Sequence, residues 1–427
     1  MRSIYSDIKK SFYLYSTFKT DTMKKITLLL FCLLAFVISY SQNCSNTSTG
    51  YIPINDLGTG NFQGAMGGLY PNGSNFIPSA HMSAGLNIAN NIQPLDTNGN
   101  VDAANGWIVW ASIGMSNTTQ ETQVFIPMTD TFAQKNPKCK LVDCAQGGQA
   151  IVQILDTTGI FWPTVNTRLA NAGVRASQVQ VVWFKEAEMG PNDTAFATYP
   201  DALKNKFKQA MQLCKTKFPN LKLCYLSSRI YAGYATTALN PEPYAYYSGW
   251  SVKRLIEEQV NGDTALTYTG TNPRSAWLAW GPYLWADGLI PRSDGLTWLC
   301  PADFNTDGTH PSNAGRQKVA NMLFNFFSTD STSTPWFLIN ASVGINEREN
   351  VLSGIFVYPN PVNNEFRISS RLNRDRVGNI EVFDLFGRKI SGVQDETVID
   401  VSHLSPGIYF VIVRGEKGEQ IAKFVKY

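Results

Sequence analysis

Short apolar segments alternate with an amphipathic one between residues 100 and 230. The segment Asp201–Phe218 places its apolar residues at steps of three and four, which predicts a helix with one buried face. The apolar segments around it are rich in Val, Ile and Leu, as expected for strands that are buried on both faces. We predict strands at Trp107–Ile113, Lys140–Cys144, Val179–Phe184 and Leu221–Leu226.

Strands separated by helices indicate an α/β fold with a central, mainly parallel sheet and helices on both faces. Such sheets place their sites at the carboxyl ends of strands. A second helix is expected at Asn313–Phe327, where apolar residues share one face. The polar stretches Ser328–Thr334 and Asn346–Asn350 suggest a boundary. We therefore expect one domain over residues 43–336 and a linker over residues 337–352.

Beyond the expected linker, the pattern changes to short alternating strands with tight turns. Residues 353–427 are numerous enough for a small domain, which we predict to be an all-β sandwich. Its expected strands are Phe366–Ser369, Asn379–Leu385, Thr397–Val401, Ile408–Arg414 and Gln420–Val425.

The N-terminal region predicts a secretory signal peptide. Lys24 and Lys25 precede the apolar run Ile26–Ile38, which is too short to span a bilayer comfortably, and the small residues of Ser39–Ser41 follow it. We expect a leader over residues 1–42, with the signal peptide at 23–41, and no stable membrane span. An N-terminal membrane anchor is the alternative.

Removal of this leader changes the charge and the number of cysteines. The whole chain has a net charge of +3, but the leader carries six cations and two carboxylates, so the remainder is nearly neutral at −1. No basic stripe suggests nucleic acid as a partner. Six cysteines remain, and an even number in an exported chain suggests disulfides rather than a metal site. The sequence does not fix the pairing; Cys139/Cys144 and Cys214/Cys224 are natural assignments, which leave Cys44 with Cys300.

Asp307 and His310 stand together in the segment Asp-Gly-Thr-His-Pro-Ser at residues 307–312. A carboxylate three residues before a histidine can hold Nδ1, so that Nε2 acts as a base. Pro311 and Ser312 favour a helix start directly behind the loop. The alternative, a surface turn before a helix, does not explain why Asp and His stand together.

A nucleophile for such a base is expected at the end of another strand. Ser116 follows the predicted strand Trp107–Ile113, behind Gly114, which permits a sharp turn. A serine there can present Oγ to an imidazole, and the amides of the next helix start can stabilise an oxyanion. Taken alone, such a segment is more often a simple strand-to-helix turn.

Together, Gly-x-Ser-Asn at residues 114–117 and the segment at 307–312 resemble the SGNH (GDSL-like) hydrolases. The resemblance covers about residues 100–330 and implies a flavodoxin-like three-layer α/β/α fold and ester hydrolysis without a cofactor. It implies Ser116 as the nucleophile, His310 as the base and Asp307 as the acid that orients it. Met115 departs from the family pattern, in which an aspartate precedes the serine.

The same resemblance implies further donors to the oxyanion. Gly148 is the expected amide donor, because Gly-Gly-Gln at residues 147–149 is similar to the family's glycine block. Asn192 lies in Gly-Pro-Asn-Asp at 190–193, which has the family's Gly-x-Asn-Asp pattern but begins late after its strand. Lys185 is the alternative, because residues 183–188 stand where related carbohydrate acetylesterases carry Trp-x-Gln-Gly-Glu. A damaged or divergent enzyme therefore stays an open alternative.

Three other features allow two interpretations each. Arg229 follows the strand Leu221–Leu226 and either orients an anionic substrate or pairs with Glu242. Residues 96–102 alternate oxygen ligands as calcium loops do, but Trp107 stands where an acidic ligand is needed, which favours a plain turn. Nine aromatic residues either line a glycan groove or belong to the core; they are Tyr231, Tyr234, Tyr244, Tyr246, Tyr247, Trp250, Trp280, Tyr283 and Trp285.

Three blocks near the C-terminus resemble the C-terminal sorting domain of the type IX secretion system of Bacteroidetes. They are Tyr-Pro-Asn-Pro-Val at 358–362, Val-Phe-Asp-Leu-Phe-Gly-Arg at 382–388 and Leu-Ser-Pro-Gly-Ile-Tyr at 404–409. The resemblance implies the secretion machinery as a partner and a secreted or cell-surface location, reached through the periplasm. A β-sandwich binding module is the alternative.

These features predict a secreted serine esterase that deacylates a carbohydrate or another extracellular ester. The alternative is a non-catalytic surface protein that keeps the fold and binds glycan or host matrix; a structural exoprotein is a third possibility. Only the esterase requires Ser116, Asp307 and His310 to converge at one end of the sheet.

Overall fold

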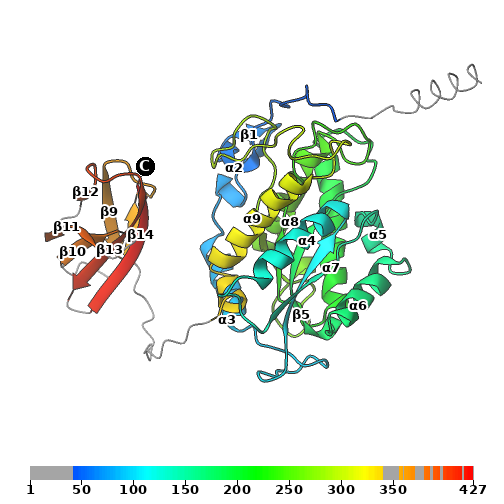
Figure 1. The fold of residues 1–427 in the computed structure, drawn as a ribbon, viewed down its shortest axis with the longest axis horizontal. Helices are drawn as coiled ribbons and strands as arrows, with labels where there is room; N and C mark the ends of the chain where they lie inside the picture. The colour runs from blue at the N-terminus through cyan, green and yellow to red at the C-terminus, as the bar shows by residue number, and fades with distance from the viewer. Residues whose placement is uncertain are drawn as a thin grey trace, which may run out of the picture. The chain divides into compact units, whose positions relative to one another are not determined.

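A computed structural model describes residues 42–339, 355–358, 360–370, 379–384, 388–394, 398–415 and 418–426. These residues fall into two units, divided after Asn340, and each unit is considered by itself (Figure 1). The expected leader and signal peptide lie outside the described residues, except for Gln42, as does most of the expected linker at 337–352. No helix in the described ranges has both the length and the apolar character to cross a membrane.

The larger unit is built on a parallel sheet with the strand order β4-β3-β5-β6-β7. From β3 the chain moves outward to β4 and then returns to add the other three strands on the opposite side. This is the strand order of flavodoxin-like sheets and confirms the predicted α/β fold. The strands are β3 (Ile108–Gly114), β4 (Cys139–Asp143), β5 (Val179–Lys185), β6 (Leu223–Leu226) and β7 (Trp277–Trp280).

Helices of very different lengths connect and cover these strands. The long ones are amphipathic and bury one stripe against the sheet or against each other. The described helices are α2 (Ile54–Leu57), α3 (Ser79–Asn90), α4 (Ser116–Asp130), α5 (Ile151–Leu155), α6 (Phe161–Asn171), α7 (Tyr199–Lys217), α8 (Tyr244–Val260), α9 (Asn313–Thr329) and α10 (Thr334–Phe337). Short 3₁₀ turns at Pro71–Gly73, Ala176–Gln178 and Thr264–Leu266 and a small hairpin of β1 (Asn61–Phe62) and β2 (Ala65–Met66) complete the unit.

Side-chain alternation along the strands assigns the helices to two faces of the sheet. On one face, the ring of Trp110 lies 5.6 Å from Phe125 of α4 and 5.8 Å from Phe327 of α9, and these two helices lie side by side (Figure 1). Trp183 of β5 stacks on Trp110 and so points to the same face. Its neighbour Phe184 points to the other face, where it contacts α7. The result is a three-layer α/β/α arrangement with a fully buried β3 and β5.

The order of the strands also locates the place where a ligand is expected. The connections that leave β3 and β5 diverge, because β3 leads to β4 on one side and β5 leads to β6 on the other. In open α/β sheets, ligands bind at the carboxyl ends of such a pair of strands. Ser116 lies two residues beyond the end of β3, so it lies at this switch point.

The polar stretch Ser328–Thr334 lies within the larger unit. Thr332 and Ser333 are fully buried, and the hydroxyl of Tyr225 donates to the Thr332 carbonyl at 2.8 Å. The hydroxyl of Ser333 donates to the Phe327 carbonyl at 2.9 Å. Internal hydrogen bonds thus allow a polar segment to pack against the core. The unit continues beyond residue 336, since Phe337 is also buried. A separate difference concerns the sheet, because the sequence analysis predicts its other four strands but not β7 (Trp277–Trp280).

One of the three expected disulfides forms among the described residues, between Cys44 and Cys300. The other two pairings are wrong, because Cys139, Cys144, Cys214 and Cys224 are buried free thiols. Cys139 begins β4 and Cys144 follows its end, and an extended strand separates residues five apart by roughly 16 Å, well beyond disulfide reach. Burial raises the pKa of Cys139 and Cys214 to about 12, so these thiols stay neutral.

The smaller unit is a β domain made of two antiparallel sheets, ordered β11-β10-β13-β14 and β12-β9-β8. Its own core contains Val362, Phe366, Ile380, Val382 and Phe424. Five strands lie where alternation predicts them, whereas β8 and β11 were not predicted. The strands are β8 (Ile355–Tyr358), β9 (Glu365–Ser370), β10 (Asn379–Phe383), β11 (Lys389–Gln394), β12 (Val398–Asp400), β13 (Gly407–Gly415) and β14 (Gly418–Lys426). Parts of the first two sequence blocks, residues 359 and 385–387, lie outside the described residues.

Candidate active site

Ser116 is held at the carboxyl end of β3 by a tight strand-to-helix connection. β3 ends at Gly114, Met115 stays extended with φ −98° and ψ −160°, and Ser116 is the first residue of α4. A Cβ at Gly114 would lie 2.4 Å from the carbonyl oxygen of Lys185, so this crossing of β3 and β5 requires glycine. The first amides of a helix have no partner within it, which leaves the Ser116 amide available beside its own Oγ.

His310 lies on a loop that is held by the helix behind it and by a glycine turn. Ser312 caps α9, because its Oγ accepts hydrogen bonds from the amides of Ala314 and Gly315 at 3.1 and 3.3 Å. Gly308 has φ +63°, and a Cβ there would lie 1.9 Å from the Tyr234 carbonyl oxygen. The helix cap and the close packing of Gly308 therefore hold the loop on both sides of His310.

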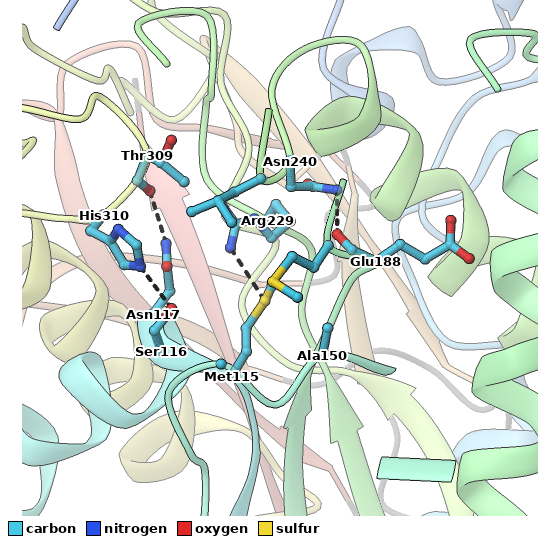
Figure 2. A pocket seen from close by; sticks show the side chains of 12 residues that line it. Met115, Ser116, Asn117, Ala150, Glu188, Arg229, Asn240, Thr309 and His310 are labelled. Carbon is cyan, nitrogen blue, oxygen red and sulfur yellow. Dashed lines mark hydrogen bonds between the residues drawn. The ribbon is translucent and has the colours of Figure 1, made fainter. Parts of the chain in front are cut away.

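Ser116, His310 and Asp307 form a continuous chain of hydrogen bonds. Ser116 Oγ lies 2.7 Å from His310 Nε2 (Figure 2), and His310 Nδ1 lies 2.5 Å from Asp307 Oδ2. Partial burial raises the pKa of Asp307, but hydrogen bonds from the His310 ring and from the amides of His310 and Thr309 outweigh it and lower the pKa to about 2. The ionised carboxylate holds the imidazole so that Nε2 can accept a proton from Ser116.

A cavity of about 170 Å³ opens in front of Ser116 and His310 (Figure 2). Enclosed pockets for drug-sized ligands measure about 300 Å³ or more, so this cavity suits a small ligand. Its walls come from the carboxyl-end loops of several strands. They are formed by Met115, Ser116, Asn117, Gly148, Ala150, Glu188, Met189, Arg229, Leu239, Asn240, Thr309 and His310.

Gly148 lies on the cavity wall next to the serine. Its φ of +73° is a conformation that glycine adopts without strain. The loop is tied to the end of β3, because the Gln146 amide donates to the Gly114 carbonyl at 2.8 Å. A Cβ built at the adjacent Gly147 would lie 3.9 Å from the Cβ of Ser116. The glycine block is thus placed beside the nucleophile.

Lys185 and Asn192 do not line the cavity. Lys185 Nζ lies 2.5 and 2.6 Å from the two carboxylate oxygens of Glu121, and both side chains are fully buried. Burial lowers the pKa of Lys185 to about 8, against the attraction of Glu121. Asn192 is exposed and lines a neighbouring depression of the surface. Asp193 caps its own turn by accepting from the Ala195 amide, so Gly-Pro-Asn-Asp is a surface turn here.

Two asparagines on the cavity wall had no role in the sequence-based prediction. Asn117 Nδ2 donates to the Thr309 carbonyl at 3.1 Å, and Asn240 Nδ2 donates to the Glu188 carbonyl at 3.1 Å (Figure 2). The position of Asn117 directly behind Ser116 could have indicated it. Asn240 lies in an irregular loop before α8, where no sequence pattern indicates it.

Arg229 lines the same cavity with its side chain almost completely buried. Its Nη1 lies 3.9 Å from the sulfur of Met115. No ion pair with Glu242 is found in the described part of the chain. Instead, the Glu242 carboxylate accepts hydrogen bonds from Trp285 Nε1 at 2.8 Å and from the amides of Ala232 and Tyr246 at 3.0 Å.

The aromatic series and the candidate calcium loop have structural roles. All nine aromatic residues are at most 6% exposed and belong to the core, so they do not form a glycan groove. In the loop at residues 96–102, one carboxylate oxygen of Asp96 accepts the amides of Asn98 and Asn100 at 2.9 Å, which is a plain turn. Within the described ranges, no group of three or more His, Cys, Asp or Glu side chains is placed to hold a metal.

Comparison with known families characterises the C-terminal unit. Residues 356–427 match the family described as the secretion system C-terminal sorting domain. The unit is a type IX sorting domain. It directs the protein to a secreted or cell-surface location, and the secretion machinery is its partner. The prediction from the three sequence blocks is confirmed.

The comparisons add little about the larger unit. A search of curated proteins finds no match. Among solved structures, a protein provisionally named as an acylhydrolase from Bacteroides fragilis NCTC 9343 is 15% identical, with a TM-score of 0.32 and coverage of 61% of this chain and 100% of that chain. An endo-β-1,4-mannanase from Thermotoga petrophila is 9% identical, with a TM-score of 0.20 and coverage of 79% and 69%. Similarities this low carry no argument about activity.

Proposed function

We propose that the protein is a secreted serine esterase of SGNH type, with its catalytic domain at about residues 43–339 and its sorting domain at 353–427. The observation that carries this proposal is the chain of hydrogen bonds from Ser116 through His310 to Asp307 at the wall of a cavity. A serine hydroxyl beside an imidazole whose other nitrogen is held by an ionised carboxylate is the arrangement that acyl transfer requires.

In the proposed reaction, Ser116 Oγ attacks the ester carbonyl carbon while His310 Nε2 takes the hydroxyl proton. The tetrahedral intermediate then collapses, the carbon–oxygen bond to the alcohol breaks, and His310 returns the proton to the leaving oxygen. Water attacks the acyl-Ser116 ester with His310 again as the base. One ester and one water give one alcohol and one acid, and Asp307 stabilises the imidazolium that forms in each half.

The negative charge on the intermediate requires hydrogen-bond donors. The Ser116 amide lies in the first turn of α4, where the partial positive charge of the helix also acts. The Gly148 amide, on the adjacent wall, is the second proposed donor. Asn192 and Lys185 are not retained as donors, because the first faces another depression and the second is bound to Glu121.

Export completes the proposal. The signal peptide at residues 23–41 carries the chain across the inner membrane, and the sorting domain carries it across the outer membrane. The substrate is then an ester outside the cell, and a carbohydrate ester is the class that we propose.

The test compares hydrolysis of p-nitrophenyl acetate and of acetylated oligosaccharides by the purified wild-type protein and by Ser116→Ala. We expect Ser116→Ala to lower kcat/KM by about 10³-fold or more. Ser177→Ala is the matched control. Ser177 lies before the amino-terminal end of β5, at the end of the sheet opposite Ser116, and its Oγ donates to the Thr97 carbonyl. If the wild type and Ser116→Ala are both inactive and both bind glycan, the esterase proposal is wrong and the protein is a non-catalytic glycan-binding protein.

A further inference from the structure

Arg229 is a buried cation on the cavity wall with no ion pair in the described part of the chain. Its side chain is 1% exposed. Removing a guanidinium from water is costly unless an opposite charge or a full set of hydrogen bonds compensates it. Around Arg229, the contact of Nη1 with the Met115 sulfur is weak compensation, because a thioether is a poor acceptor.

None of the acidic groups near Arg229 forms an ion pair with it among the described residues. Glu121 is bound by Lys185, and Glu242 accepts hydrogen bonds from Trp285 and two amides. Burial raises the pKa of Glu186 well above its usual value, and its Oε2 accepts a hydrogen bond from the Ala187 amide at 2.9 Å. Burial likewise raises the pKa of Tyr199, whose hydroxyl stays neutral. In the described part of the chain, no carboxylate therefore contacts the guanidinium of Arg229 directly.

The unused edge of the guanidinium has the shape that a carboxylate fits. Arg229 Nε and Nη2 have no hydrogen-bond partner among the described residues. The same two atoms of Arg292 bind both carboxylate oxygens of Asp294, at 2.9 and 2.7 Å. Two parallel N–H donors on one edge favour bidentate binding of a carboxylate over a neutral group.

Unused acceptors lie on the same cavity wall. Asn117 Oδ1 and Asn240 Oδ1 are buried without a partner among the described residues, while the Nδ2 of each donates to a carbonyl. Those hydrogen bonds fix which end of each amide is the oxygen. Figure 2 shows Arg229 between the Ser116–His310 pair and Asn240. Hydroxyl groups are the donors that such isolated amide oxygens accept.

We propose that the substrate is an acylated sugar acid, whose carboxylate binds to Arg229 and whose hydroxyl groups donate to Asn117 and Asn240. The proposal rests on the esterase function given above and names its substrate class. The ester then lies next to Ser116, because Met115, which contacts Arg229, directly precedes the nucleophile. Arg229 is a specificity residue here, and the bond-making steps are unchanged.

The first test changes only the substrate. The wild-type protein is given an O-acetylated methyl glucuronoside as the free acid and as its methyl ester, which differ in one negative charge. We expect kcat/KM for deacetylation of the free acid to exceed that of the methyl ester by roughly 10- to 100-fold, as charge-assisted hydrogen bonds allow. Equal values for the two substrates would overturn the proposal whatever any variant does.

The second test changes Arg229 and follows the ratio of the two kcat/KM values. Arg229→Gln is expected to bring the ratio to about 1, and Arg229→Lys to restore part of it through the point charge. Arg292→Gln, a buried arginine that already has its carboxylate, is the matched control and keeps the wild-type ratio. A loss of activity in Arg229→Gln by the same factor for both substrates would instead assign Arg229 to the oxyanion and overturn the proposal.

A binding measurement separates failure of this inference from failure of the esterase proposal. If the wild type hydrolyses none of the esters, the esterase function fails, but the site is still tested by thermal shift of Ser116→Ala with glucuronate and with its methyl ester. A rise in Tm with glucuronate alone, lost in Ser116→Ala/Arg229→Gln, supports the sugar-acid site. No rise with glucuronate contradicts it.

Discussion

Two polar clusters lie at the carboxyl ends of the neighbouring strands β3 and β5, and they have opposite surroundings. The cluster of Ser116, His310 and Asp307 opens to the cavity, and the side chains of His310 and Asp307 are 20% and 29% exposed. The pair of Lys185 and Glu121 is closed, with both side chains 0% exposed. Both clusters contain an ionised group with close hydrogen bonds. Only the open one can meet a substrate.

The difference arises from where each strand stops. β5 continues through Lys185, so alternation sends this side chain to the same face as Trp183, toward Glu121 of α4. β3 stops at Gly114, two residues before Ser116, which is therefore free of the pleat and faces the cavity. In this sheet, the last residue of β5 is buried in the pleated part, whereas the residue beyond the end of β3 reaches the cavity.

The largest expected effect concerns the open cluster. Asp307→Asn removes the charge that orients His310 and is expected to lower kcat for p-nitrophenyl acetate by about 10³- to 10⁴-fold. The free energy of unfolding at pH 7 should change little, because the side-chain oxygen of the asparagine in this variant can still accept the hydrogen bonds from the backbone amides of Thr309 and His310. Steady-state kinetics and urea unfolding check the two parts. A variant with wild-type kcat would show that this carboxylate is structural.

The closed cluster is expected to respond in the opposite way. Lys185→Met leaves the buried Glu121 without its partner and should lower the free energy of unfolding by about 3–5 kcal/mol. The double variant Lys185→Met/Glu121→Leu should recover most of that loss, because it removes both charges. Urea unfolding of the three proteins measures this. If Lys185→Met were as stable as the wild type but inactive, Lys185 would be an oxyanion donor after all.

A second enclosed carboxyl, Glu242, tests how burial acts without a cation. Part of the residue reaches the surface, but its carboxyl group is enclosed, and desolvation raises the pKa to about 7, against the hydrogen bond from Trp285 and those from two amides. The folded protein thus holds a proton that the unfolded chain releases near pH 4.5. The contribution of Glu242 to the free energy of unfolding is therefore fully present below pH 4.5, and it is lost as the pH rises through 7.

Because of this shift in the pKa of Glu242, the free energy of unfolding of the wild type should fall by at most about 3 kcal/mol between pH 5 and pH 7.5. Glu242→Gln cannot ionise, so its free energy of unfolding should fall less over the same range. Urea unfolding at several pH values compares the two proteins. Parallel curves would show that Glu242 ionises equally in the folded and unfolded chain.

The smallest expected effect concerns the support behind the open cluster. Ser312→Ala removes the cap of α9 and should lower the free energy of unfolding by about 1 kcal/mol. His310 is also held by the Asp307 hydrogen bonds and the glycine turn, so kcat should change by less than about threefold. Thermal unfolding and kinetics measure both values. A large loss of kcat with normal stability would show that the cap itself positions His310.

Much of this arrangement could be predicted from local sequence patterns. Four of the five strands of the parallel sheet are apolar runs rich in Val, Ile and Leu, and the helices α7 and α9 have their apolar residues on one face, so these elements need no tertiary information. Gly114, Ser116, Asp307 and His310 were predicted because each lies in a short segment whose chemistry depends on neighbours in the sequence. The strand Trp277–Trp280 was missed, since four apolar residues in an aromatic-rich stretch show no period.

What could not be predicted depends on packing between distant segments. The direction of Lys185 follows from the residue at which β5 ends, and its partner Glu121 lies 64 positions away. Asn240 reaches the cavity through an irregular connection after β6, whereas Arg229, soon after the end of that strand, was a candidate from the sequence. The buried aromatic residues have a composition that suits a glycan groove or a core equally well, and only their burial decides between the two.

The most direct test of the central claim asks whether Ser116 is an activated nucleophile. The wild-type protein is incubated with a fluorophosphonate, which phosphonylates activated serines, and the modified peptide is identified by mass spectrometry. The open cluster predicts one adduct, at Ser116, which forms much more slowly in His310→Ala. An unmodified Ser116, or a Ser116 that reacts equally fast in wild type and His310→Ala, would contradict the account.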